Sequence, residues 1–229
     1  MFFSLITPAD GREREAAHRG PSSTYAEHQW LWGMFSAPQG TPRDFLFRRS
    51  QVDGLPRFYV VSHREPQPMG DTWQIHSRRY KPQIQAGDRL GFELRANPSV
   101  RHGRDGKSKR HDVVMETKKR LLAERGLTRW ADLPAREKPD LHSVVQQSCI
   151  AWLTRRSIKL GFTVNEESVV VEGYEQRSEQ ADRSLQFSTV DLRGELTVAD
   201  PPAFVGALFD GIGSAKAFGC GLLLVRPMS

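Results

Sequence analysis

Apolar and polar residues alternate along several segments of the chain, which is the pattern of strands that bury one face. The pattern is clearest over residues 88–97, where Leu90, Phe92 and Leu94 alternate with polar or small residues. Residues 44–51 and 57–63 flank a Val-Asp-Gly-Leu-Pro turn, which predicts a hairpin. The remaining predicted strands cover residues 2–7, 73–82, 167–174, 184–198 and 221–227.

Three segments have helical signals. Thr24-Tyr-Ala-Glu27 forms a capping box, which predicts a helix from near Tyr25 to about Phe35. Residues 139–160 carry the longest helical pattern, with one apolar stripe made of Leu141, Val145, Cys149 and Trp152.

The third helix is predicted to start after Asp200. This residue precedes two prolines, so we expect it to be the N-cap, with Pro201 at the first helical position. Gly211 is expected to end the helix.

The order of these elements predicts an α+β fold. The second half reads strand–helix–strand–strand–helix–strand, the ferredoxin-like arrangement of RNA-recognition (RRM-like) domains. The first half gives strand–helix–strand–strand, and no second helix is evident. We therefore predict two tandem ferredoxin-like domains, residues 1–86 and 87–229, with a C-terminal glycine-rich loop.

The charge balance favours an anionic partner. The chain has 33 Lys and Arg against 27 Asp and Glu, a formal net charge of +6, which suits nucleic acid, an acidic protein or a membrane surface. No apolar run has the length of a membrane span or of a signal-peptide core. With only two cysteines, Cys149 and Cys220, the sequence indicates a cytoplasmic protein with reduced thiols.

Residues 211–221, "GIGSAKAFGCG", form the glycine-rich loop. It runs from a helix into a strand, whereas nucleotide-binding loops run from a strand into a helix, so we expect no nucleotide cofactor. Its exposed N–H groups and Lys216 could hold a phosphodiester, with Gly213, Gly219 and Gly221 allowing close approach. The alternative is a tight turn that merely tolerates glycine.

Three segments carry a resemblance to a known family. Residues 200–227, residues 25–35 followed by "DFLFRR", and the basic stretch 94–115 resemble the CRISPR-associated repeat-RNA endoribonucleases of the CasE family, from type I-E Cascade. The resemblance implies a double ferredoxin-like fold that binds a CRISPR repeat hairpin. It also implies metal-free cleavage through the RNA 2′-OH, with the product kept beside other Cascade subunits.

His28 and Tyr25 are the predicted catalytic residues. His28 lies one turn after Tyr25 at a helix start, where free N–H groups attract phosphate and the dipole favours neutral imidazole. The resemblance places the family's catalytic His and Tyr at these positions. Both could instead be packing residues. Gly33 stands where some relatives carry a lysine, and Lys216 is a candidate substitute. The histidine spacing predicts no metal site.

Two further basic segments are predicted to contact RNA. Residues 101–110 carry five cations and are expected to form a flexible arm, disordered without RNA. The other segment is the C-terminal end of the helix at 139–160, whose cations could simply complement the helix dipole. The predicted contacts are Arg101, Arg104, Lys107, Lys109, Arg110, Arg155, Arg156 and Lys159.

Two other functions stay open. A non-catalytic subunit of the same fold could hold a hairpin that another enzyme cuts. An unrelated ferredoxin-like enzyme could act on a small anion, although such a substrate needs no basic arm. A thiol nucleophile at Cys220 is a further alternative, but no histidine lies near it in sequence, which favours a packing role.

Overall fold

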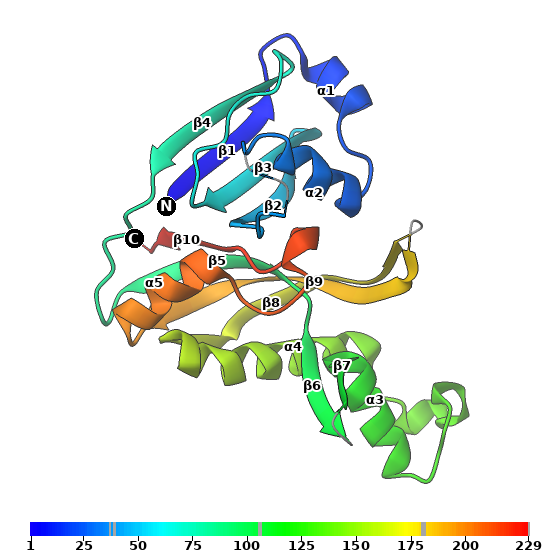
Figure 1. Cartoon of the computed structure of the whole chain (residues 1–229). Helices are drawn as coiled ribbons and strands as arrows, with labels where there is room; N and C mark the ends of the chain where they lie inside the picture. Colours follow the sequence, from blue (N-terminus) through cyan, green and yellow to red (C-terminus); the bar gives the residue numbers. More distant parts are fainter. Residues whose placement is uncertain (37, 39, 105–106, 180–181, 229) are drawn as a thin grey trace. The chain divides into compact units, whose positions relative to one another are not determined.

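The computed structural model describes residues 1–36, 38, 40–104, 107–179 and 182–228. Its contacts divide the chain into two compact units (Figure 1). The first comprises Met1–Ile84 and Val205–Leu223, and the second comprises Gln85–Phe204 and Leu224–Ser229. The glycine-rich loop thus packs with the N-terminal residues, while the domain limits predicted from sequence, 1–86 and 87–229, stay a prediction.

The first unit contains a four-stranded sheet. Its strands are β1 (Phe2–Pro8), β2 (Phe45–Val52), β3 (Leu55–Ser62) and β4 (Trp73–Arg79), in the order β2-β3-β1-β4. All three neighbouring pairs are antiparallel. Asp53 and Gly54 both have positive φ between β2 and β3, the geometry of a two-residue hairpin turn.

Two helices connect β1 to β2 in this unit. They are α1 (Glu13–Arg19) and α2 (Thr24–Trp32). The helix α2 packs on the sheet, with Leu31 in one buried cluster with Ile6, Phe47 and Phe58 (Figure 1). No helix forms over residues 63–72, all of which are described, so β3 leads to β4 through a loop.

The strand and helix order predicted for the second half of the chain is present, with an additional hairpin and helix inserted after its first strand. Its sheet is β10-β5-β9-β8, the same order as in the first unit when the strands are numbered within each unit. The strands are β5 (Arg89–Ala96), β8 (Phe162–Glu179), β9 (Asp182–Val198) and β10 (Leu223–Pro227). The prediction of an α+β, tandem ferredoxin-like fold is confirmed.

The helices of this sheet follow the sequence signals. Helix α4 (Leu141–Ser157) packs along β8 (Figure 1). Helix α5 (Pro201–Asp210) begins in the second unit and ends in the first. The N-cap at Asp200 is confirmed, because its Oδ1 accepts from the N–H of Ala203 at 3.2 Å. The short 3-10 helices are η1 (Trp130–Asp132), η2 (Ala135–Glu137), η3 (Ile158–Leu160) and η4 (Lys216–Phe218).

The prediction that residues 101–110 form a flexible arm is wrong. Strands β6 (Ser99–Arg104) and β7 (Lys107–Asp112) form an antiparallel hairpin, with residues 105 and 106 outside the described part. Helix α3 (Val113–Ala123), which the sequence analysis missed, follows directly.

Buried polar contacts hold the base of this hairpin. The carbonyl of Ser99 accepts from Trp152 Nε1 at 3.0 Å and from Arg156 Nη2 at 2.7 Å. Asp112 accepts from the Tyr174 hydroxyl at 2.9 Å and caps α3. These partners lie far away in sequence, so the charged segment itself gives no sign of them.

Among the described residues, none of the helices combines the length and apolar character needed to cross a membrane.

Candidate active site

The helix α2 is fixed on β2 at its first turn. Ser23 is the N-cap, since its hydroxyl accepts from the N–H of Ala26 at 3.1 Å. The predicted cap at Thr24 is therefore wrong by one residue, because the run Ser-Ser-Thr offers three hydroxyls. Glu27 is buried and accepts from Arg49 Nη1 of β2 at 2.9 Å. The helix ends at Trp32, before the predicted Phe35, with Gly33 as C-cap.

His28 is half-buried against aromatic rings. Its Nε2 accepts from Trp32 Nε1 at 3.0 Å, and its ring centroid lies 6.0 Å from that of Phe45. Burial lowers the pKa of His28, and the positive charge of Arg43 lowers it further. The imidazole is therefore neutral at pH 7, which is the form required of a general base. A proton can reach Nε2 only after the bond to Trp32 opens.

Tyr25 lies on the same helix as His28 but has a different partner. Its side chain is 44% exposed, and its hydroxyl accepts from Gln29 Nε2 at 2.9 Å. The structure thus places both predicted catalytic residues on α2. Their roles stay a prediction.

The glycine-rich loop contacts α2 and β2 through η4. Gly211, Gly213, Gly219 and Gly221 all have positive φ. A Cβ at Gly211 would lie 2.8 Å from Leu46, and one at Gly219 would lie 3.2 Å from the Phe47 ring. Turn geometry therefore accounts for all four glycines, and packing on β2 also requires glycine at Gly211 and Gly219. Gly213 is exposed, whereas Gly219 and Gly221 are buried; their predicted RNA contacts stay a prediction.

We expect Gly219→Ala to destabilise the protein by about 1–3 kcal/mol, the usual cost of a side chain in a sparsely populated backbone region. Gly206→Ala in α5 is the matched control, since a Cβ there meets nothing within 4 Å. This substitution should be neutral or stabilise by up to about 1 kcal/mol, because alanine favours helix. Urea unfolding measures both; equal unfolding free energies would contradict the packing explanation.

Cys220 is fully buried in this loop, which favours the packing role over a nucleophile. Cys149 is also free and buried, and burial raises the pKa of its thiol to about 12. Among the described ranges, no group of three or more His, Cys, Asp or Glu side chains has the arrangement of a metal site.

Lys216, on η4, lines a cavity of about 330 Å³ in the first unit with Arg43, Asp44 and His63. Its Nζ donates to the carbonyl of Asp210 at 2.5 Å. Arg43 was not among the predicted site residues. It precedes β2, and no local motif distinguishes it from other surface arginines.

The β6–β7 hairpin places like charges opposite each other. In its register Arg101 faces Arg110 and His102 faces Lys109, and all four are exposed. Opposed like charges destabilise a strand pair, so an anion between Arg101 and Arg110 would relieve their repulsion. Arg104 and Lys107 pair at the tip through their backbones; their side chains lie outside the described part.

The cations at the end of α4 differ in their surroundings. Arg156 stacks on Trp152, with 4.4 Å from Cζ to the ring centroid, and donates to Ser99. It therefore stabilises the hairpin base from within the second unit. Arg155 is exposed and donates through Nε to the carbonyl of Ala151 at 3.1 Å. Lys159 is exposed.

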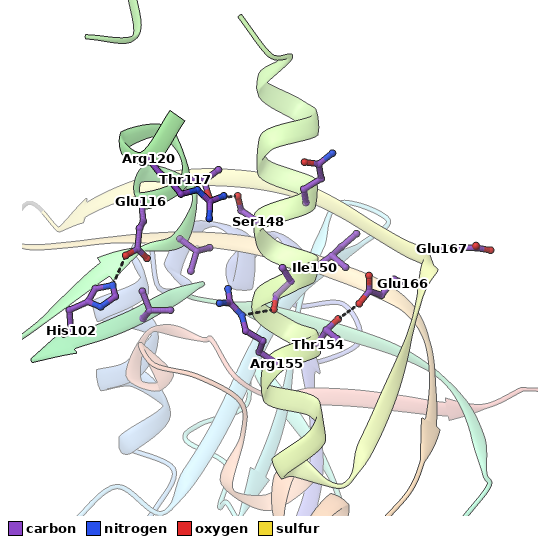
Figure 2. A pocket seen from close by; sticks show the side chains of 14 residues that line it. His102, Glu116, Thr117, Arg120, Ser148, Ile150, Thr154, Arg155, Glu166 and Glu167 are labelled. Atoms are coloured by element: carbon purple, nitrogen blue, oxygen red, sulfur yellow. Dashed lines mark hydrogen bonds and ion pairs between the residues drawn. The ribbon is translucent and has the colours of Figure 1, made fainter. Parts of the chain in front are cut away.

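A larger cleft of about 1070 Å³ lies in the second unit, among β6, α3, α4 and the start of β8 (Figure 2). Six of its polar side chains form three pairs: His102 with Glu116, Thr117 with Ser148, and Thr154 with Glu166. Of the predicted RNA-binding residues it contains Arg155, and neither His28 nor Tyr25 lines it. The cleft is thus separate from the predicted catalytic pair.

Comparisons with known proteins identify the family. A family model described as "CRISPR associated protein" matches residues 1–227. The chain is 30% identical to the CRISPR system Cascade subunit CasE of Escherichia coli over 208 residues, covering 89% of this chain and 92% of that one. It is 27% identical to the CRISPR-associated endoribonuclease Cse3 of Thermus thermophilus over 241 residues, covering 97% of each.

Solved structures share the fold. Thermus thermophilus Cse3 bound to an RNA representing a pre-cleavage complex superposes with a TM-score of 0.68 at 24% identity, over 99% of both chains. Cas6e from Escherichia coli gives a TM-score of 0.62 at 24% identity over the full length of both. Together with the full-length family match, these findings show that the chain belongs to the CRISPR-associated CasE family.

Proposed function

We propose that this protein is an endoribonuclease that binds the CRISPR repeat hairpin, cleaves precursor CRISPR RNA and stays on the guide RNA as a Cascade subunit. The observation that carries the proposal is His28, half-buried in the middle of α2 against Trp32 and Phe45, in a chain of this family. Relatives named as an endoribonuclease and a Cascade subunit support it.

The proposed reaction needs no metal and no cofactor. The 2′-oxygen of the nucleotide 5′ of the cut attacks the adjacent phosphorus, and the bond from phosphorus to the 5′-oxygen breaks. His28 takes the proton of the 2′-OH, and the leaving oxygen gains a proton. The products are a 2′,3′-cyclic phosphate and a 5′-OH. In this proposal the Tyr25 hydroxyl orients the phosphate or stabilises developing charge.

Two observations favour a second candidate, a non-catalytic subunit that only holds the hairpin. The indole N–H of Trp32 occupies His28 Nε2, and Gly33 supplies no cation where some relatives carry a lysine. In that case the basic hairpin and the loop would bind RNA while another enzyme cuts it.

The test is incubation of the purified protein with a panel of synthetic CRISPR repeat hairpins in excess EDTA. The nuclease proposal expects one cut beside the stem, a cyclic phosphate on the upstream fragment and a 5′-OH on the downstream one. Tight binding without any cut would support the non-catalytic subunit and contradict the nuclease.

Neutralising the basic hairpin, by changing Lys107, Lys109 and Arg110 to alanine, should weaken RNA binding and flatten its salt dependence. Each lost phosphate contact should lower the slope of log affinity against log salt by a little under one unit. The matched control removes three exposed cations elsewhere, Arg14, Lys81 and Lys138. Equal slopes for the two triple variants would mean that the hairpin has no special part in RNA binding.

We also place the protein in the cytoplasm. Both cysteines are free and buried, which fits a reducing compartment. The proposed partners, a precursor RNA and the other subunits of its complex, fit the same location.

A further inference from the structure

The cavity beside β2 brings together charged residues from three parts of the first unit. Arg43 and Asp44 directly precede β2, and His63 directly follows β3. Asp210 and Lys216 come from the C-terminal stretch that holds the end of α5 and η4. Phe45 also lines this cavity, and its ring centroid lies 6.0 Å from that of His28. Phe45 thus contacts both this cavity and the ring of His28, which does not itself line the cavity.

Arg43 has a donor group without an acceptor. Its Nη1 is buried and has no hydrogen-bond partner among the described residues. The neighbouring carboxylate of Asp44 accepts instead from the Nε and Nη2 of Arg64, each at 2.7 Å. A buried guanidinium N–H is costly to leave unsatisfied.

Lys216 adds a second positive charge to this cavity. Its Nζ donates to the backbone carbonyl of Asp210 at 2.5 Å, which places the ammonium at the end of α5. Asp44 forms an ion pair with Arg64. Asp210 is therefore the carboxylate of the cavity lining that is left to balance the charges of Arg43 and Lys216. Counted together with Arg64, which pairs with Asp44 from outside the lining, these groups carry one excess positive charge when His63 is counted as neutral.

The electrostatics agree with this geometry. Burial lowers the pKa of the Arg43 guanidinium. Burial also lowers the pKa of Lys216, with Asp210 acting in the opposite direction and Arg43 adding to the decrease. Two partly desolvated cations that repel each other are stabilised when an anion enters between them.

We propose that Arg43 and Lys216 together bind one RNA phosphodiester, at the cut or at a linkage next to it. The proposal rests on the proposed function and deepens it. A planar guanidinium can donate two parallel N–H bonds to the non-bridging oxygens of a phosphate, while the ammonium acts as a point charge. The pair would supply, from the residue before Asp44 and from η4, the positive charge that Gly33 does not provide after α2.

The test combines protein variants with RNA in which single phosphates are made neutral. A 2′-deoxy, non-cleavable form of the hairpin that the protein binds is synthesised with one methylphosphonate at each linkage around the cut in turn. Affinity is measured for the wild type and for Arg43→Gln and Lys216→Met, which keep most of each side chain's volume. Arg14→Gln and Lys81→Met, at exposed positions, are the matched controls.

For the wild type, we expect one linkage at which the methylphosphonate weakens binding about 10- to 100-fold, the range of a lost charge-assisted hydrogen bond. In Arg43→Gln, the methylphosphonate at that same linkage should weaken binding further by less than about twofold. Lys216→Met should show the same small loss of affinity at the same linkage. In the control variants, the methylphosphonate at this linkage should weaken binding as much as it does in the wild type. A variant with a general folding defect would weaken binding to every RNA without selecting one linkage.

If the loss of affinity caused by each variant and the loss caused by the methylphosphonate simply add at every linkage, the phosphate site is overturned, even if the wild type cleaves RNA. A wild type that binds the hairpin without cutting it would contradict the nuclease proposal alone, because the affinities of the variants for the methylphosphonate RNAs still test the phosphate site. A wild type that binds no hairpin would overturn both.

Discussion

A single 2′-deoxy substitution at the nucleotide 5′ of the cut should abolish cleavage and leave hairpin affinity nearly unchanged. The 2′-oxygen is the nucleophile in the proposed reaction, so its removal leaves no group to attack the phosphorus. The loss should be complete rather than partial, since water would have to replace an intramolecular nucleophile whose effective concentration is very high. Denaturing gels measure the cut, and filter binding measures the affinity.

The matched control is a 2′-deoxy substitution one nucleotide further from the cut, which should be cleaved at close to the normal rate. Both substrates are assayed in excess EDTA. Normal cleavage of the first substrate, or a requirement for Mg²⁺, would refute attack by the 2′-OH and would point to hydrolysis by a bound metal.

The parts of the fold that the sequence predicted are those with local signals. Leu90, Phe92 and Leu94 alternate in β5 and are buried, and Asp200 caps α5 as its position before two prolines indicated. Helix α1 gave no such signal, because Ala16 is its one buried residue. Helix α3 begins directly after the charged hairpin, so its short apolar pattern does not stand out from the basic segment.

Distant contacts explain what the sequence could not predict. The β6–β7 hairpin is held by Trp152 and Arg156 at Ser99, and a charged, glycine-bearing segment gives no indication of partners in another helix. Arg43 lies close enough to Lys216 to lower the pKa of its ammonium. Lys216 is on η4, far from Arg43 in sequence, so the sequence gives no sign of this pair. His28 was identified through its family resemblance and its helix position, whereas its bond to Trp32 depends on side-chain packing.

His28→Ala should lower the cleavage rate by about two to four orders of magnitude, the usual contribution of a general acid–base group. Hairpin affinity should change little, because the proposed RNA contacts lie elsewhere. Single-turnover cleavage at saturating protein measures this rate. In the wild type the rate should fall on the acid side only below about pH 6.5, the ordinary histidine value, because burial and Arg43 lower the pKa of His28. The neutral base therefore persists to lower pH.

Because His28 packs against Trp32 and Phe45, alanine could also loosen α2, and two controls separate the effects. His28→Gln keeps an acceptor for the Trp32 N–H and much of the volume, so it should preserve the melting temperature and still lose the rate. His18→Ala, at an exposed position on α1, should change neither. If the rate survives in His28→Gln, or falls only together with affinity and melting temperature, His28 stabilises α2 and the base must be another group.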